Sequence, residues 1–407
     1  MGIMHKKRKI IAVYCMIFAW VLIFSGCGKT EPEENKNTGQ SVVIENLANR
    51  ETDISSHLAF QGSMELHYAE RFAVDYYDGG YILLTVADER RFLVAPEGEE
   101  APEDLPEDIV VLKRPVENLY LVATAVMDMF RELDALSSIR FSGQKAEGWY
   151  IEEARKAVET GDMLYAGKYN MPDYEVIVSE GCSLAIENTM ISHAPEVIEK
   201  LESFGIPVLI DYSSYESHPL GRVEWIKFYG ALLGKEEEAW EAFREQEDIL
   251  ERVSQEARSG KTVAFFYITT NGAVNVRKSS DYVPKMIALA GGQYIFADLG
   301  SDADYKSSVT MQMEEFYAAA KEADYLIYNS TIDGEIHFIE ELLEKSNMLE
   351  DFKAVKEGNV WCTTSDLYQQ SMSIGTFIED IHDMLSGNPE SQREMQYLYL
   401  LEQEEVQ

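Results

Sequence analysis

Residues 236–257, EEEAWEAFREQEDILERVSQEA, separate two halves of the chain that show the same pattern of apolar runs. Within this stretch a mostly apolar stripe recurs at intervals of three and four residues, with acidic residues on the opposite face (Ala239, Ala242, Phe243, Gln246, Ile249, Leu250, Val253 and Ala257). The helical pattern extends back to residue 217, with a break near Gly234-Lys235, and Ser259-Gly260 ends it. We therefore expect a helical connector over residues 217–258 that includes one long rigid helix.

On both sides of this connector, short apolar runs alternate with helical spacing, a pattern typical of parallel sheets covered by helices on both faces. The expected strands are Ile109–Leu112, Ile139–Phe141, Leu184–Ile186, Ile206–Ile210, Val263–Ile268, Tyr325–Tyr328 and Val360–Cys362. The expected helices are 119–136, 151–159, 195–204, 282–290, 313–320, 336–345 and 373–385. The sequence predicts an α/β protein of two lobes with mostly parallel sheets, covering residues 56–216 and 259–398, joined by the long helix.

The start of the first lobe has a different pattern. Two β-rich runs, Phe72–Tyr77 and Tyr81–Val86, flank the turn Asp78-Gly79-Gly80, which is a hairpin signal. Phe92–Val94 predicts a further strand, and the acidic, Pro-rich residues 97–108 predict a surface loop. We expect an added hairpin at this end of the first lobe and an acidic tail at residues 399–407.

The N-terminal residues are typical of an export signal. The basic cluster Lys6–Lys9 precedes an apolar stretch, residues 10–24, which ends in Ser25-Gly26-Cys27. Small residues directly before a cysteine resemble a lipobox, so residues 1–26 are expected to be a lipoprotein signal peptide and Cys27 the lipidated residue. The alternative, an uncleaved membrane anchor, conflicts with the stretch being shorter than the ~20 residues that span a bilayer. The protein is then expected on the outer face of the cytoplasmic membrane, held by a flexible tether over residues 27–55.

Composition narrows the classes of function. The 407 residues are 46% hydrophobic and 11% aromatic, enough to bury two cores, and the net charge is −37. So large an excess of acidic residues argues against nucleic acid as a partner, because phosphate binding needs clustered Lys and Arg. Cys182 and Cys362 are expected to be free thiols, and no Cys-x-x-Cys pair or His-rich cluster predicts a metal site. No cofactor is expected.

Several short segments then occur in a familiar order. They are Pro172-Asp173-Tyr174-Glu175-Val176-Ile177, Ser203-Phe204-Gly205-Ile206-Pro207-Val208, Gly230-Ala231-Leu232-Leu233-Gly234-Lys235-Glu236, Ala290-Gly291-Gly292 and Ala323-Asp324-Tyr325-Leu326-Ile327. In this order, behind a lipobox, they resemble the substrate-binding proteins of ABC importers. They look like the subgroup that captures iron–siderophore complexes, haem and cobalamin, in which one rigid helix joins the lobes. The resemblance covers roughly residues 105–390.

The resemblance implies a monomeric, lipid-anchored solute-binding receptor, not an enzyme. It would capture a small molecule, a metal chelate, between its lobes and deliver it to an ABC permease with its ATPase. One alternative is a receptor for a bare transition-metal ion, for which Glu187, His193, Glu216 and His218 would have to converge. Another is a secreted α/β enzyme, although the sequence has no Gly-x-Ser-x-Gly elbow, P-loop or zincin helix.

In such a fold the ligand lies outside the carboxyl ends of the strands, and the loops at those ends can be identified in the sequence. In the first lobe Arg114 could meet an anionic ligand or be an ordinary surface residue. The pair Trp149-Tyr150 could cover a flat ligand or cap the core of its own lobe. The other ligand-binding candidates in this lobe follow two of the expected strands and are Glu187, Tyr215 and His218.

The candidates in the second lobe also follow strands. They are Asn271, Arg277, Trp361 and Tyr368. Arg277 is the first choice for pairing with a ligand carboxylate or catecholate, because a guanidinium makes bidentate charged bonds; its alternative is a surface salt bridge. The resemblance further implies that one Glu on each lobe docks with Arg residues of the permease, and Glu175 and Glu314 match those positions.

Overall fold

The structure is a computed structural model that describes residues 47–300, 307–387 and 394–403. The predicted signal peptide, Cys27 and the first part of the predicted tether lie outside the described residues. In the part that is described, none of the helices has the length and hydropathy of a membrane-spanning segment.

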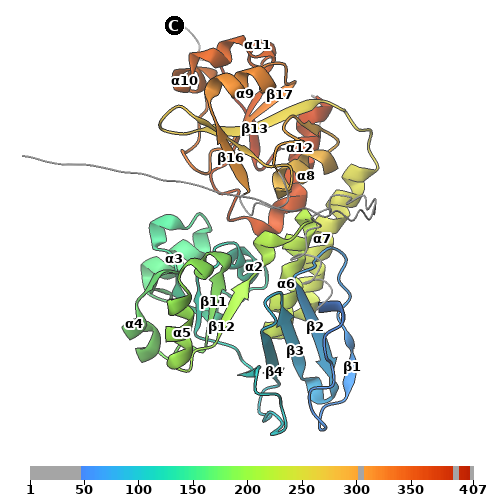
Figure 1. Cartoon of the computed structure of the whole chain (residues 1–407), viewed down its shortest axis with the longest axis vertical. Coiled ribbons are helices and arrows are strands. Elements are labelled where there is room, and N and C mark those ends of the chain that lie inside the picture. Colours follow the sequence, from blue (N-terminus) through green and yellow to red (C-terminus); the bar gives the residue numbers. More distant parts are fainter. Residues whose placement is uncertain (1–46, 301–306, 388–393, 404–407) are drawn as a thin grey trace, which may run out of the picture. The chain divides into compact units, whose positions relative to one another are not determined.

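The first sheet has five strands, which lie beside one another in the order of the sequence (Figure 1). They are β1 (Phe60–Ser63), β2 (Phe72–Tyr77), β3 (Ile82–Val86), β4 (Arg91–Ala95) and β5 (Ile109–Lys113). The predicted hairpin is confirmed as β2 and β3, which pair antiparallel about a turn in which Gly79 has φ of 72°. A left-handed φ of this kind favours glycine, which explains the Asp-Gly-Gly sequence of the turn.

Residues 47–55, assigned from the sequence to the tether, pack on this first sheet. Leu47 and Ile54 are buried, and the Arg50 guanidinium pairs with the buried carboxylate of Asp75. The packed structure therefore begins before residue 56.

The second sheet is parallel throughout, in the order β12-β11-β6-β7-β8. Its strands are β6 (Leu119–Leu121), β7 (Ile139–Ser142), β8 (Leu164–Tyr165), β11 (Leu184–Asn188) and β12 (Val208–Asp211). The helices between them are α2 (Val126–Glu132), α3 (Glu152–Thr160), α4 (Tyr174–Ser179) and α5 (Pro195–Ser203). Leu184 and Ile186 join one core and Ala185 another, so side chains on both faces of the sheet are buried.

Two expectations for this region were wrong in part. The helix predicted over residues 119–136 is a strand, β6, followed by the short α2. Leu119, Tyr120 and Leu121 are all completely buried between neighbouring strands, so they carry no amphipathic pattern and their spacing matched a helix by coincidence. The strand predicted at Ile109–Leu112 exists as β5, but it is the edge of the first sheet, and Val110 and Val111 are exposed rather than buried.

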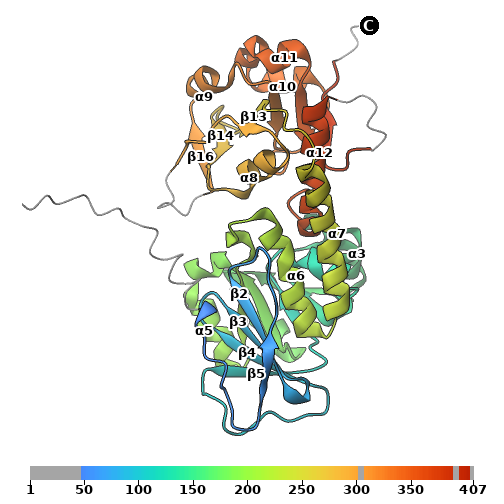
Figure 2. The ribbon, with the colours of Figure 1, turned by 90° about the vertical axis from the view of Figure 1, so that its right-hand side faces the viewer.

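The connector is two helices, α6 (Pro219–Leu233) and α7 (Glu236–Ser254), which lie side by side (Figure 2). The predicted break is confirmed: Gly234 ends α6 with φ of 77°. Gly230 explains how closely the helices approach, because a Cβ there would lie 2.5 Å from the Cβ of Ala239. α6 is buried along nearly its whole length, and α7 also packs on α12 (Ile374–Ser386) of the second lobe.

The third sheet is mixed, in the order β16-β14-β13-β17-β18-β19, with β15 also paired to β13. Its strands are β13 (Thr262–Ile268), β14 (Val274–Arg277), β15 (Gln293–Tyr294), β16 (Ser308–Met311), β17 (Tyr325–Tyr328), β18 (Val360–Thr363) and β19 (Leu398–Leu400). Its helices are α8 (Tyr282–Leu289), α9 (Met313–Ala320), α10 (Ile339–Lys345), α11 (Lys353–Glu357) and α12 (Ile374–Ser386). The central strands β13, β17 and β18 are parallel, as predicted. The fold class, α/β with parallel sheets flanked by helices, is confirmed.

Candidate functional site

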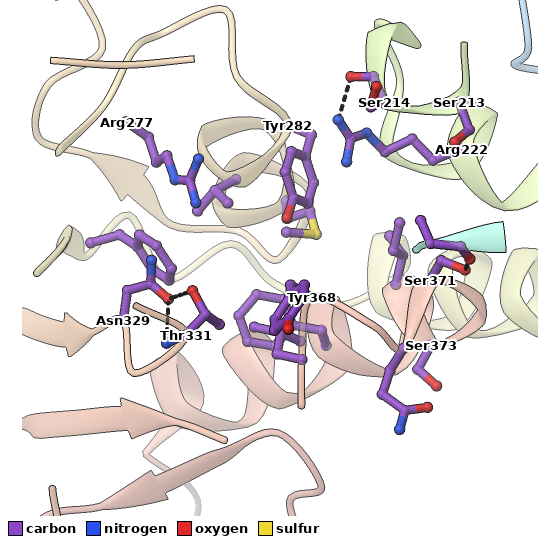
Figure 3. Close-up of a pocket in the computed structure, with 18 of the residues that line it drawn as sticks. Ser213, Ser214, Arg222, Arg277, Tyr282, Asn329, Thr331, Tyr368, Ser371 and Ser373 are labelled. Carbon is purple, nitrogen blue, oxygen red and sulfur yellow. Dashed lines mark hydrogen bonds between the residues drawn. The ribbon is translucent and has the colours of Figure 1, made fainter. Parts of the chain in front are cut away.

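A pocket lined by residues from both lobes encloses about 720 Å³ of empty space when the open solvent at its mouth is included (Figure 3). The first lobe and α6 supply Ala125, Met129, Ser213, Ser214 and Arg222. The second lobe supplies Phe265, Arg277, Tyr282, Val283, Met286, Asn329, Thr331, Leu367, Tyr368, Gln370, Ser371, Ser373, Ile374 and Phe377. The pocket therefore lies where the loop after β12 and the first turn of α6 meet the loops of the third sheet.

Arg222 comes from the first turns of α6 and reaches across to the second lobe. Its Cζ lies 3.8 Å from the centre of the Tyr282 ring, and its Nη2 donates to the carbonyl of Ser214. Its Nε is buried and has no hydrogen-bond partner among the described residues. A ligand acceptor at this point would satisfy a donor that the protein itself leaves unpaired.

Arg277, at the end of β14, is the second guanidinium of the pocket. Its Nη1 lies 3.8 Å from Asp281 Oδ2 and 3.5 Å from Ser307 Oγ, so both contacts are long. Asp281 is itself engaged, because it accepts from the backbone N–H of Val283 at the start of α8. Burial raises the pKa of Asp281, and Arg277, Arg222 and Lys285 act in the opposite direction.

The charge of the pocket is opposite to the charge of the chain. Its lining residues include two arginines and no Asp or Glu, in a protein with 72 acidic residues. Figure 3 shows Tyr282 between the two guanidiniums, with Tyr368 facing the same space. Apolar side chains, among them Phe265 and Phe377, complete the wall. Such a site fits a ligand that has anionic oxygens beside flat or apolar groups.

The hydroxyl of Tyr368 is arranged to donate. Gln369 Nε2 donates to the Tyr368 hydroxyl oxygen at 3.0 Å, which leaves the hydroxyl proton for another acceptor. The ring of Tyr150 packs edge-on against Tyr368, with centroids 6.1 Å apart. Both rings are more than 40% exposed, so they lie at the accessible side of the site.

The structure brings some of the predicted ligand-binding residues together. Arg277 and Tyr368 line the pocket, and Tyr150 contacts Tyr368. Tyr215 is exposed two residues beyond the lining residue Ser213. His218 starts α6, where its Nδ1 accepts from the Leu220 N–H and its ring stacks on Tyr68 at 4.4 Å.

The remaining predicted ligand-binding residues are placed away from the lining. Trp149 is buried in the core of its own lobe and donates to Ser142 Oγ. Arg114 lies against Gly234 and donates to the carbonyl of Ala231, at the far end of α6 from Arg222. Asn271 accepts from Thr269 in the β13–β14 turn, and Trp361 lies within β18. Glu187 is fully buried in β11.

Sequence reasoning missed Arg222, Tyr282 and Gln369. Arg222 and Tyr282 lie within helical patterns, which were interpreted as connector and lobe core. The available signal was Arg222 itself, one of three charged residues in a largely apolar helix, beside Glu224 and Lys227. A long cationic side chain that is half-buried in such a helix requires a partner or a function.

The residues of the bare-metal alternative do not form a cluster. No group of three or more His, Cys, Asp or Glu side chains within the described ranges is arranged to hold a metal ion. Glu216 instead accepts from the backbone N–H groups of Glu70 and Arg71 and from Trp225 Nε1. The free thiols of Cys182 and Cys362 are partly and fully buried, and burial raises the pKa of both.

The predicted docking residues occupy equivalent positions on their helices. Glu175 lies in the first turn of α4, and Glu314 in the first turn of α9. Both side chains are exposed, and neither lines the pocket.

Comparisons with known proteins agree with this architecture. A family model described as "Periplasmic binding protein" matches residues 150–367, which is more than half of the chain. The uncharacterized lipoprotein MJ0878 of Methanocaldococcus jannaschii is 26% identical over 386 residues, covering 89% of each chain. A second uncharacterized lipoprotein of that organism, MJ0872, is 25% identical over 372 residues, covering 89% of this chain and 90% of its own.

Solved structures share the fold at low sequence identity. A periplasmic binding protein from Veillonella parvula has a TM-score of 0.54 and 18% identity, and the match covers 71% of this chain and 97% of that one. The periplasmic heme binding protein HutB of Vibrio cholerae has a TM-score of 0.52 and 15% identity, covering 65% and 97%. These matches establish the fold and leave the ligand open.

Proposed function

Because the chain belongs to the periplasmic binding protein family, we propose that it is a lipid-anchored receptor that captures an anionic metal chelate between its two lobes. The receptor then delivers the chelate to an ABC permease and its ATPase. We rank an iron–siderophore complex first among the ligand classes, and haem and cobalamin second. The one observation that carries this proposal is the pair Arg222 and Arg277, which line one pocket from different parts of the chain without any acidic neighbour in the lining.

The charge and the aromatic surface of the lining favour an anionic chelate. A guanidinium binds carboxylate or catecholate oxygens through short charged hydrogen bonds, which are stronger than neutral ones. Tyr282 and Tyr368 offer aromatic surface beside these donors, which suits the flat rings of a catecholate or a porphyrin. A pocket with donors on both sides and no carboxylate favours an acceptor-rich ligand over a cation.

The anchor is proposed from Cys27 and from the lipoprotein relatives. If Cys27 carries the lipid, Cys27→Ser should release the protein from the membrane fraction or leave it unprocessed. A Cys27→Ser protein that remained in the membrane at its normal mature size would contradict the anchor.

Titration of residues 37–407, which form one compact unit, tests the ligand class. The probes are an anionic ferric tricatecholate, a neutral ferric trihydroxamate, haemin and cyanocobalamin. Binding of each probe is measured by the change in tryptophan fluorescence of the protein. We expect the anionic chelates to bind more tightly than the neutral one. Arg222→Gln and Arg277→Gln should each weaken anionic binding by about 10- to 100-fold, the loss of one charged hydrogen bond.

Arg155→Gln is the matched control, because Arg155 is exposed on α3 and does not line the pocket. It should bind like the unmodified protein. Equal affinity for charged and neutral chelates, unaffected by either pocket substitution, would contradict the proposed ligand class.

A further inference from the structure

One loop of the second lobe both lines the pocket and contacts the first lobe. Residues 367–373, which we call the clasp, are the part of the β18–α12 connection that directly precedes α12. The clasp supplies Leu367, Tyr368, Gln370, Ser371 and Ser373 to the pocket lining. Its buried members, Gln369 and Met372, contact the first lobe instead.

Gln369 makes the central contact. Its side chain is fully buried, its Oε1 accepts from the Tyr150 backbone N–H at 2.8 Å, and its Nε2 donates to the Gly148 carbonyl at 2.7 Å. The same Nε2 donates to the Tyr368 hydroxyl. One amide therefore joins the backbone of the first lobe to a side chain of the ligand pocket.

Two further contacts hold the clasp on α2 and the residue before it. Ser371 Oγ donates to the Ala125 carbonyl at 2.6 Å, and the Met372 backbone N–H donates to Asp128 Oδ2 at 2.8 Å. Asp128 is fully buried and also pairs with Arg131. Ala125 and Met129, which flank Asp128, line the pocket themselves. The clasp therefore binds the segment of the first lobe that forms the opposite wall of the pocket.

We propose that Gln369 is a positioning residue that fixes the pocket side chains of the clasp against the first lobe before a ligand binds. The inference rests on the proposed function, because it assigns a role in that same pocket. A pre-organised pocket avoids the cost of ordering the loop and the lobes when the ligand arrives. Loss of the Gln369 bonds should therefore let the lobes separate more widely in the ligand-free protein.

The test uses residues 37–407 with Cys182 and Cys362 replaced by alanine and with spin labels at Glu199→Cys and Glu350→Cys. Both label sites are exposed, one on α5 of the first lobe and one beside α11 of the second. Pulsed electron paramagnetic resonance then gives the distribution of distances between the lobes without any ligand. We expect a narrow distribution in the parent protein and one about two-fold broader in Gln369→Leu, because the opened clasp permits local motion.

Gln246→Leu is the matched control. Gln246 Oε1 accepts from the backbone N–H of Gly375 at 3.0 Å, so it holds the start of α12 on α7 rather than on the pocket side of the first lobe. It should lower the melting temperature and leave the distance distribution narrow. Equal broadening in Gln246→Leu and Gln369→Leu would overturn the proposal, because the effect would then reflect general destabilisation.

A narrow distribution in Gln369→Leu would overturn it as well. If Gln369→Leu does not fold, Ser371→Ala removes one clasp bond with little risk, and its distribution should broaden to a smaller extent; a parental distribution would overturn the proposal. The measurement needs no ligand, so failure of the chelate titration would count against the proposed function alone. Among chelates that do bind, Gln369→Leu should raise the dissociation rate by about 10-fold, whereas Gln246→Leu should not.

Discussion

The buried carboxylates of this protein are treated in two different ways at the residue scale. Glu224 accepts from three successive backbone N–H groups, those of His67, Tyr68 and Ala69, at 2.7–2.8 Å. Glu187 is equally buried, yet neither of its oxygens has a hydrogen-bond partner among the described residues. Burial without partners raises the pKa of Glu187 to about 8. A charge at Glu187 is therefore costly, and a charge at Glu224 is well solvated by the backbone.

The raised pKa of Glu187 predicts how stability depends on pH. Between its ordinary value of 4.5 and about 8, the folded state holds a proton that the unfolded state has released. Stability therefore falls as pH rises through this window, by at most about 1.4 kcal/mol per pH unit, and levels off above it. Glu187→Gln keeps the shape and removes the charge. Its free energy of unfolding should equal that of the unmodified protein at pH 5 and be higher than that of the unmodified protein at pH 9.

Urea unfolding at both pH values measures this difference, with Glu159→Gln on exposed α3 as the control. A lower stability of Glu187→Gln than of the unmodified protein at pH 9 would contradict this role of Glu187. An equal loss of stability by these two proteins between pH 5 and pH 9 would contradict it as well.

The residues of the site could be predicted where they follow a strand in sequence. Tyr368 comes after β18, and Arg277 was predicted from its place after the strand Val263–Ile268, which is β13; the carboxyl ends of strands are the expected place for a ligand. Arg222 and Gln369 could not be found in this way. Their roles depend on which helix and which loop meet across the lobes, and that packing is absent from any local pattern. Trp149 shows the converse, because an aromatic residue in a loop was equally compatible with a core position.

At the scale of the elements, one segment ties the first sheet to the connector. Residues 67–71 lie across the start of α6, where Glu224 of this helix and Glu216, which precedes it, accept their backbone N–H groups. Gly221 permits the contact, because a Cβ there would lie 2.9 Å from the carbonyl oxygen of Tyr68. Lys227, fully buried, pairs with Glu224 at 2.7 Å and lies over the Trp240 ring. The same helix presents Arg222 to the pocket, so this segment fixes an element of the site.

The two members of the buried pair should therefore differ in importance. Glu224→Ala removes the acceptor of three backbone donors and leaves Lys227 buried without its partner, and it should cost about 3–5 kcal/mol of unfolding free energy. Lys227→Met keeps an apolar chain against Trp240 and leaves Glu224 with its backbone donors, and it should cost about 1–2 kcal/mol. Denaturant unfolding of both variants measures the order, and a larger loss in Lys227→Met would contradict this account.

Elements with strong periodicity were predicted well, and elements set by tertiary pairing were not. The stripe on α7 and the break at Gly234 follow directly from helix geometry and glycine conformation. β6 was interpreted as helix because a strand in the middle of a parallel sheet is apolar on both faces and has no alternation. β14, β16 and β19 were missed because these strands are short and pair antiparallel, and the pairing of β16 and β19 depends on neighbours far away in sequence.

At the scale of the whole molecule, capture and delivery should involve separate surfaces. Glu175 and Glu314, one on each lobe, are exposed and lie outside the pocket lining. We expect Glu175→Lys with Glu314→Lys to leave chelate affinity unchanged and to reduce uptake by cells, because like charges would then oppose each other at the permease, a repulsion of several kcal/mol. Each single reversal should give a partial loss.

Binding by purified protein and uptake by cells are measured side by side, with Glu159→Lys, an exposed residue of α3, as the control reversal. Normal uptake in the double variant would remove both residues from docking. Weakened binding would place at least one of them beside the ligand.

If the pocket between the lobes holds an anionic metal chelate, the receptor should carry that ligand in its own host. Native mass spectrometry and the absorbance spectrum of receptor recovered from host membranes would identify the ligand. We expect a metal chelate with anionic oxygens, present in the unmodified protein and lost from the Arg222→Gln, Arg277→Gln double variant. A bare metal ion, a ligand without anionic oxygens, or a chelate retained undiminished by the double variant would contradict it.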